Sequence, residues 1–312
     1  MDSTDVRIFC EMAFNPQNSS FPKRLPSAAD IGKALGLDEK TVRTRVKNME
    51  ESGFIKYYQL VPNLALFGLR SIGTFRFEAM NLATKAEVVK KFGTAHQLVE
   101  GYDYIGNSVV ATFAGVTSAD VEKASDLLAS RFELGKTKVG ERAVREPLSK
   151  LDTVDYQIMR ELRYDAQAKM KAIAGKLGLT QRMVEYRVGK IVSSGSVLVR
   201  ATIDPKKQAG LVFFELDVTV DEDRHPEAVR KIRERYSERL WQFSTPTAGR
   251  FVGNFFAFSL GEPEDVALEV REMKGVRMCL PFVLKETVEP GKPNWIDRLI
   301  EQSIERTSIL QT

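Results

Sequence analysis

Basic and hydroxyl side chains recur at helical spacing between residues 40 and 47. At about 100° per residue, some of them share one side of the helix and the others lie on its flanks. The outward side carries Lys40, Thr44 and Lys47, flanked by Thr41 and Arg43. Lysine, arginine and threonine donate hydrogen bonds to phosphate oxygens and base edges, so this face predicts contacts with DNA. Taken alone, such a face is more often the solvated surface of an ordinary bundle helix.

The whole stretch occurs twice, and the repetition favours the DNA-binding interpretation. Ile31–Ile55 and Ile173–Val197 align without a gap, 142 residues apart. The second copy turns Arg182 and Tyr186 outward, a face with less charge than the first. We predict DNA contacts from the second copy through Arg182, Tyr186 and Lys190.

Local helix signals position both faces. Ser27 and Asp30 make a capping box, which predicts that a helix begins directly after Ser27. Gly36 can adopt the left-handed conformation that ends this helix, and Asp38 caps the next one. Thr180 holds the same cap position in the second copy. Two short helices joined by a glycine-containing turn predict a helix-turn-helix, whose second helix enters the major groove of DNA.

Composition is that of an ordinary globular protein with several domains. The 312 residues are 43% apolar and 28% charged, and the net charge is only +4. This charge is unevenly distributed, with +6 over residues 149–211 and −4 over residues 212–312. A basic region beside an acidic one favours attraction of phosphate at one end of the molecule.

Few residues of this sequence suit metal or redox chemistry. Cys10 and Cys279 are the only cysteines, and both lie in apolar contexts typical of buried thiols. His96 and His225 are the only histidines and lie far apart in the sequence. We therefore expect no disulfide framework, metal site or cofactor. We also expect a cytoplasmic location without membrane contact, because neither a leader pattern nor a run of 18 apolar residues is present.

Alternating strand and helix signals follow each helix-turn-helix stretch. Residues 70–147 predict the order βαββαβ, the ferredoxin-like arrangement, and residues 212–288 repeat it. The fold class is therefore α+β, with two winged helix-turn-helix domains alternating with two ferredoxin-like domains. The expected boundaries are 1–69, 70–148, 149–211 and 212–290, with a helical tail over 291–312. Within the first domain, Asn15–Pro26 has the composition of a loop.

Extended segments join the two kinds of domain. They cover Phe54–Val61 and Ser196–Ile203, and a strand pair here would be the wing of a winged helix. Lys56, Tyr57 and Tyr58 then either reach DNA or pack against the following domain.

In this order of elements the chain resembles two fused copies of the leucine-responsive regulatory protein (Lrp/AsnC) family. The resemblance covers roughly residues 1–290 and is most specific in the helix-turn-helix stretches. The matching motifs are Leu35-Gly36-Leu37, Thr41-Val42-Arg43-Thr44-Arg45-Val46, Ser52-Gly53-Phe54-Ile55 and Gly68-Leu69. The family's fold implies a winged helix-turn-helix followed by a ferredoxin-like domain that binds small effectors, often amino acids.

The resemblance also implies an effector region. A glycine followed shortly by an aspartate and then a strand marks it in the family, and Gly101, Tyr102 and Asp103 match this pattern. Asp103 either receives an effector's ammonium group or holds its own turn. The second copy has Gly249 but no following aspartate. Because the duplication departs from the one-copy pattern, one chain could form a pseudo-dimer, or two chains could form a homodimer.

These observations predict a sequence-specific DNA-binding transcriptional regulator, modulated by a small effector, that is not an enzyme. Some proteins that resemble this architecture are instead enzymes that decarboxylate siroheme-type tetrapyrroles, and such a site would need histidines and arginines around the tetrapyrrole. A third reading is a sensor or architectural protein whose second helix-turn-helix does not bind DNA. Selection of bound DNA from random sequence distinguishes the regulator from both.

Overall fold

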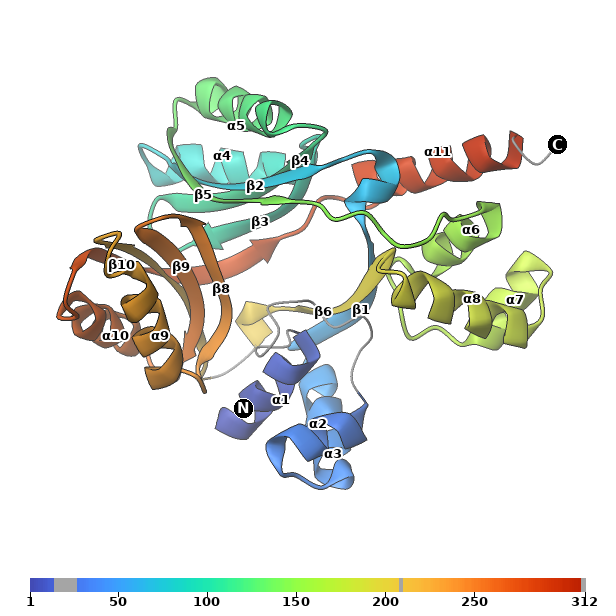
Figure 1. Ribbon diagram of the computed structural model, residues 1–312, viewed down its shortest axis with the longest axis horizontal. Helices are drawn as coiled ribbons and strands as arrows, with labels where there is room; N and C mark the ends of the chain where they lie inside the picture. Colours follow the sequence, from blue (N-terminus) through green and yellow to red (C-terminus); the bar gives the residue numbers. More distant parts are fainter. Residues whose placement is uncertain (14–26, 208–209, 310–312) are drawn as a thin grey trace.

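The structure, a computed structural model, describes residues 1–13, 27–207 and 210–309 (Figure 1). The loop predicted over Asn15–Pro26 therefore lies outside the described residues. The first repeat contains α1 Ser3–Ala13, α2 Ala28–Leu35, α3 Glu39–Glu51, β1 Ile55–Pro62, η1 Leu64–Phe67, β2 Ser71–Glu78, α4 Leu82–Phe92, β3 Leu98–Tyr104, β4 Ser108–Gly115, α5 Ser118–Phe132 and β5 Gly135–Ala143.

The second repeat has the same order of helices and strands. It contains α6 Thr153–Leu162, α7 Met170–Leu177, α8 Gln181–Ser193, β6 Val197–Ile203, η2 Pro205–Lys207, β7 Val212–Val220, α9 His225–Arg235, β8 Leu240–Thr247, β9 Arg250–Ala257, α10 Glu262–Arg271 and β10 Val276–Val288. The tail forms α11, Trp295–Ile309. The predicted α+β class, with helix-turn-helix and βαββαβ units alternating, is confirmed.

The predicted caps begin and end the helices of both helix-turn-helix units. Ser27 and Asp30 form the capping box of α2, and Gly36 ends that helix at a φ of 69°. Asp38 accepts a hydrogen bond from the Thr41 amide at the start of α3. In the second repeat Thr180 caps α8 in the same way. These local contacts set where the helices on either side of the turn begin and end.

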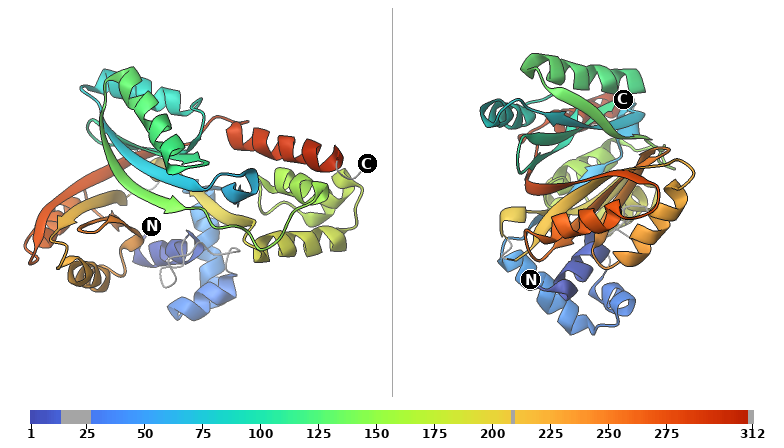
Figure 2. Two further views of the ribbon diagram at one scale, coloured as in Figure 1. Left: turned by 45° about the horizontal axis from the view of Figure 1, so that its top comes forward. Right: turned by 90° about the vertical axis from the view of Figure 1, so that its left-hand side faces the viewer.

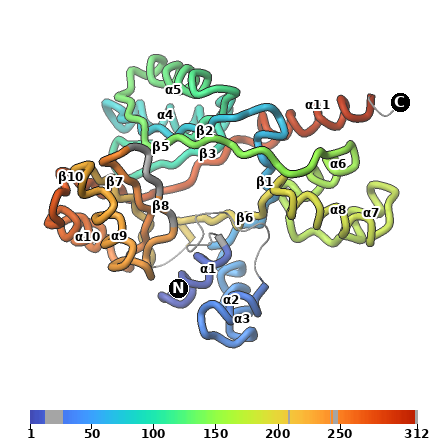
Figure 3. The backbone as a smooth tube through the Cα atoms, in the orientation of Figure 1, coloured from blue at the N-terminus to red at the C-terminus, as the bar shows by residue number. Residues whose placement is uncertain are grey.

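The wing predicted within each repeat is instead formed between the repeats. β1 pairs with β6 along an antiparallel register that runs from Ile55 opposite Ile203 to Pro62 opposite Val197. The tube in Figure 3 shows this two-stranded ribbon running between the two helix-turn-helix units. Each repeat contributes one strand, so the ribbon joins the two units within one chain.

Among the described residues, eight strands form one antiparallel sheet in the order β5-β2-β4-β3-β10-β7-β9-β8. Each repeat contributes four adjacent strands, a half-sheet in the ferredoxin-like order. β10 joins the halves, because its first part pairs with β7 and its last part with β3. The sheet is strongly curved, so the two half-sheets face one another (Figure 2). Pro281 lies in the part of β10 that pairs with β7 alone.

Alternation along the strands separates an outer face from an inner one. On β2, Phe75 and Phe77 belong to the core beneath the helices of the first half. The intervening Arg76 points to the other half-sheet, where it forms buried ion pairs with Glu215 and Asp217 of β7. The charged side of β7 is therefore enclosed between the half-sheets. Its charges are tolerated there because each carboxylate has a guanidinium partner.

Each helix-turn-helix is anchored differently. Phe9 and Phe54 of the first pack against Phe213 and Trp241 of the second half-sheet, within one apolar cluster. The second helix-turn-helix is covered by α11, which runs beside α6 (Figure 1). Ile300 of α11 is buried in the core of this second unit. The predicted amphipathic tail thus packs on the body of the same chain.

Candidate nucleic-acid interface

The outward face of α3 is accessible along its length. Lys40, Arg43, Thr44 and Lys47 are exposed, and Thr41 is half-buried beside the cap. Arg43 pairs with Glu39 and Lys47 with Glu51, both one helical turn apart on the surface. Exposed ion pairs of this kind contribute only about 0–1 kcal/mol to stability. Arg43 and Lys47 can therefore each leave the glutamate and bind a phosphate instead.

Lys40 differs from its neighbours on α3. Within the described part of the chain it forms no ion pair, and its position in the second repeat is held by Arg182, which forms none either. Both residues lie in the first turn of the second helix of their unit. In helix-turn-helix proteins this end of the helix contacts base edges. Each repeat therefore presents, at the same position, one cationic side chain that has no ion-pair partner among the described residues.

The face of α8 is otherwise unlike that of α3. Tyr186, at the position of Thr44, is 74% exposed, and Gly189 replaces Lys47. Glu185 replaces Arg43 and accepts a hydrogen bond from Gln181. The face of α8 thus offers an aromatic ring and a carboxylate at the positions where the face of α3 offers hydrogen-bond donors.

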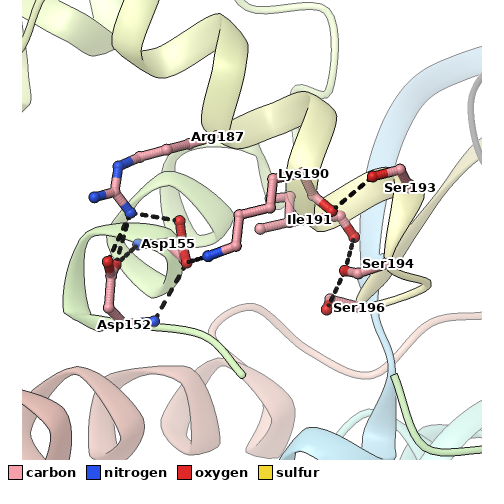
Figure 4. Close-up of polar contacts among 8 residues, drawn as sticks. All are labelled: Asp152, Asp155, Arg187, Lys190, Ile191, Ser193, Ser194 and Ser196. Carbon is pink, nitrogen blue, oxygen red and sulfur yellow. Dashed lines mark hydrogen bonds and ion pairs between the residues drawn. The ribbon is translucent and has the colours of Figure 1, made fainter. Parts of the chain in front are cut away.

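Lys190, predicted to contact DNA, lies in an internal ion network (Figure 4). Its Nζ is 3.1 Å from Oδ2 of Asp155, and it is only partly exposed. Arg187 donates to both Asp152 and Asp155 at 2.7–2.9 Å. The network ties α8 to the start of α6, so Lys190 has a structural role and its contact with DNA stays a prediction.

The first repeat contains the equivalent clamp, which sequence reasoning missed. Arg45 donates to Asp2 and Asp5 and holds α3 against the start of α1. Burial raises the pKa of Asp2, but hydrogen bonds from Asp5 and Arg45 lower it by more, so the pKa lies below its usual value. The sequence did contain a signal for this clamp. The arginine is shared by the two repeats, and each repeat begins with a pair of aspartates that can accept its hydrogen bonds.

Of the two roles considered for Tyr57 and Tyr58 in the β1–β6 ribbon, the contacts favour packing against the rest of the chain. The Tyr57 hydroxyl donates to Glu289 and the Tyr58 hydroxyl to Glu50. Tyr58 is buried, whereas Lys56 is exposed. Both rings therefore pack against the rest of the chain, and of the three residues only Lys56 is placed to reach a ligand.

The predicted effector residues lie together on β3, at the junction of the two half-sheets. The Asp103 carboxylate is 2% exposed and lies 2.6 Å from Lys85 Nζ and 2.8 Å from Lys285 Nζ. A Cβ atom at Gly101 would lie 2.4 Å from the Phe92 ring, so this glycine permits close packing of α4. Tyr102 lines the cavity between the half-sheets. Effector binding by these residues stays a prediction, and the two lysines give Asp103 a structural role.

The residues considered for metal chemistry are dispersed. His96 lies beside the ring of Trp295, and His225 lies beside Phe251. Burial raises the pKa of both the Cys10 and the Cys279 thiol to about 12. No group of three or more potential metal ligands occurs in the described residues. None of the helices described is both long enough and apolar enough to span a bilayer.

Comparisons with known proteins agree with this arrangement of elements. Residues 151–191 match the family model of the AsnC-type helix-turn-helix domain, and residues 26–56 match that of a winged helix-turn-helix DNA-binding domain. The resemblance to a duplicated Lrp/AsnC-type protein is confirmed. An uncharacterized HTH-type transcriptional regulator of Pyrococcus abyssi is 28% identical over 123 residues, which are 38% of this chain and 68% of that protein.

A solved structure shares the architecture of the whole chain. The siroheme decarboxylase NirDL aligns over 99% of this chain and 100% of its own, with a TM-score of 0.57 and 13% identity. Its complex with an iron-uroporphyrin III analogue covers 96% of this chain and 100% of its own, with a TM-score of 0.56 and 12% identity. At such low identity these likenesses define the fold and not the reaction.

Proposed function

We propose that this protein is a DNA-binding transcriptional regulator whose two helix-turn-helix units contact DNA, and which a small effector modulates from the ferredoxin-like region. One observation carries the proposal. Lys40 at the start of α3 and Arg182 at the start of α8 are exposed and form no ion pair with the described residues. The two helix-turn-helix matches and the regulator of Pyrococcus abyssi support it. Such a regulator acts in the cytoplasm, where the DNA is.

The two units contribute unequally in this proposal. α3 carries the donors that distinguish bases, whereas α8 carries Arg182 for phosphate and Tyr186 for an apolar or backbone contact. Because β1 and β6 join the units, one chain acts as a pseudo-dimer with two unlike faces. A homodimer of two chains is the alternative assembly.

The test is the salt dependence of DNA affinity, measured by fluorescence anisotropy. Affinity should fall with salt by about 0.9 logarithmic units per neutralised phosphate. Lys40→Ala and Arg182→Ala should each reduce this slope or the affinity, whereas Lys90→Ala, an exposed lysine on α4, should change neither. Affinity that does not respond to salt would overturn the electrostatic interface. An effect of Lys40→Ala alone would support a second unit that does not bind DNA.

Tetrapyrrole decarboxylation is the second candidate, because the whole-chain architecture is shared with NirDL. Three observations weigh against it. The cavity between the half-sheets measures about 200 Å³, below the roughly 300–1,000 Å³ of sites for drug-sized ligands. Ion pairs of Arg76 fill part of the space between the half-sheets, and both histidines lie elsewhere. Absorbance titration with siroheme tests this candidate, and a bound spectrum followed by loss of carbon dioxide would establish it.

A further inference from the structure

The two half-sheets carry an apolar patch at the same place, but the side chains of the two patches differ in size. In the second half-sheet, Phe213 of β7 lies opposite Phe256 of β9. At the same place in the first half-sheet, Ile72 of β2 lies opposite Ala114 of β4. The neighbouring strands carry Trp241 in the second patch and Val99 in the first, again at corresponding positions. Three aromatic residues in one patch thus correspond to three smaller residues in the other.

The aromatic patch contacts the first helix-turn-helix unit directly. The ring of Phe9 in α1 has its centroid 6.5 Å from that of Trp241, and the ring of Phe54 lies 6.3 Å from that of Phe213. Cys10 of α1 is buried in the same cluster. The first unit and the second half-sheet therefore share one continuous apolar core.

The patch of smaller residues is covered by α11 instead. Trp295 and Ile296, in the first turn of α11, are 5% and 3% exposed and belong to the same cluster as Ile72 and Ala114. The Trp295 indole N–H also donates to the Leu98 carbonyl of β3, at 2.6 Å. The first turn of α11 therefore supplies the apolar bulk that aromatic side chains supply in the other half-sheet.

The same helix also contacts the second helix-turn-helix unit. Asp297 accepts a hydrogen bond from Arg163 at 3.2 Å and one from the Tyr164 hydroxyl at 2.5 Å, both at the end of α6. Further along α11, Ile300 is buried in the core of the second unit. α11 therefore bridges the first half-sheet and the second unit, whereas the first unit meets its half-sheet without such a bridge (Figure 1).

We propose that α11 is a spacer that holds the second helix-turn-helix unit at a fixed place relative to the first half-sheet. It thereby sets the distance between the recognition helices α3 and α8. The second unit has other attachments, namely the β1–β6 ribbon and the contact of Tyr156 with Phe67. Loss of α11 should therefore loosen this unit without detaching it. For DNA, the consequence rests on the proposed function: α11 then determines which separation of half-sites one chain can contact.

Distances between pairs of spin labels on the full chain, measured by double electron–electron resonance, test the spacer. Ser130→Cys places one label on α5, above the first half-sheet, in both pairs. Gly175→Cys on α7 completes the second-unit pair, and Lys33→Cys, at the corresponding position on α2, completes the first-unit pair. The three positions are exposed, whereas the native Cys10 and Cys279 are buried, so labelling should be selective.

Removal of residues 291–312 should widen the distance distribution of the second-unit pair and leave that of the first-unit pair unchanged. Because this truncation also uncovers apolar side chains, a size-matched variant accompanies it. Trp295→Phe combined with Asp297→Asn keeps the apolar cover but removes the indole donor and the carboxylate charge. It should widen the second-unit distribution by less than the truncation does. Glu305→Gln, on the exposed side of α11, is the matched control and should change neither distribution.

Two results would overturn the spacer. One is a second-unit distribution that stays as narrow in the size-matched variant as in the labelled parent. The other is equal widening of both distributions in that variant, since a spacer acts on one unit only.

Affinity for DNA duplexes that carry the two selected half-sites at varied separations distinguishes this inference from the proposed function. The parent should prefer one separation. The size-matched variant should lose about ten-fold in affinity there, because a loosened unit forfeits part of the roughly hundred-fold or larger gain from two linked sites. An identical preference in parent and variant would overturn the role of α11 in half-site separation. A parent that binds no DNA would overturn the proposed function, and the label distances would still decide whether α11 is a spacer.

Discussion

Arg187 links α8 to the start of α6, and its replacement by glutamine should loosen the second helix-turn-helix. Its guanidinium donates to Asp155, whose side chain is 0% exposed, and to Asp152. Removing the partner of a fully buried charge costs about 3–5 kcal/mol. Lys190 remains 3.1 Å from Asp155 and keeps part of this stabilisation. We therefore expect Arg187→Gln to lower the local free energy of unfolding by about 2–3 kcal/mol, the range of one charged hydrogen bond.

The first repeat supplies a matched comparison. Arg45 makes the same contacts, but Asp5 is 14% exposed and Asp2 is 57% exposed. Since water solvates these carboxylates when the arginine is removed, Arg45→Gln should cost only about 1 kcal/mol. Lys176→Gln, which removes a surface pair with Glu161, should cost less than that.

Native-state hydrogen exchange measures these local stabilities helix by helix. Arg187→Gln should speed exchange in α6 and α8 and leave α2 and α3 unchanged. Arg45→Gln should do the reverse, with a smaller effect. Equal effects of the two substitutions, or faster exchange throughout the chain, would refute the idea that burial of the aspartate sets the strength of each clamp.

Two further predictions concern acid and packing. Burial raises the pKa of the Asp152 carboxyl, but hydrogen bonds from Arg187 and from the Asp155 amide lower it by more, so the pKa lies below its usual value. Its stabilisation is therefore complete above about pH 4 and is lost as the pH falls through the folded-state pKa. The free energy of opening of α6, obtained from exchange rates corrected for the intrinsic pH dependence of amide exchange, should therefore fall in acid in wild type but not in Arg187→Gln. Gly101→Ala should lower the melting temperature, because its Cβ would lie 2.4 Å from the Phe92 ring and overpacking costs about 1–3 kcal/mol; an unchanged melting temperature would show that Phe92 can move aside.

Features that depend on neighbouring residues were predictable from the sequence. Ser27, Gly36, Asp38 and Thr180 define helix ends through contacts within a few residues, and the structure has each of them in that role. The order of strands and helices followed from hydrophobic periodicity for the same reason. The exposure of Lys40 and Arg182 was also predictable, because it depends only on the position of each residue on its helix.

Features that depend on distant pairing were not predictable. β1 and β6 are separated by most of one repeat, and nothing local shows that they pair with each other rather than within their own units. Arg76 and Glu215 are 139 residues apart in the sequence, so nothing near either residue indicates their ion pair. The contact of Lys190 with Asp155 was not predicted, because Asp155 lies 35 residues away on another helix. In each case the partner strand or side chain lies far away in the sequence.

Selection of bound DNA from random sequence, with light scattering on the selected complex, tests the central claim most directly. A single chain with two unlike recognition faces should select two different half-sites about 34 Å apart. The sharper base preference should belong to the half-site that Lys40→Ala relaxes, at about 1–3 kcal/mol per lost base contact. Arg182→Ala should weaken binding evenly across sequences. A palindrome of one repeated motif, bound by two chains, would contradict the claim.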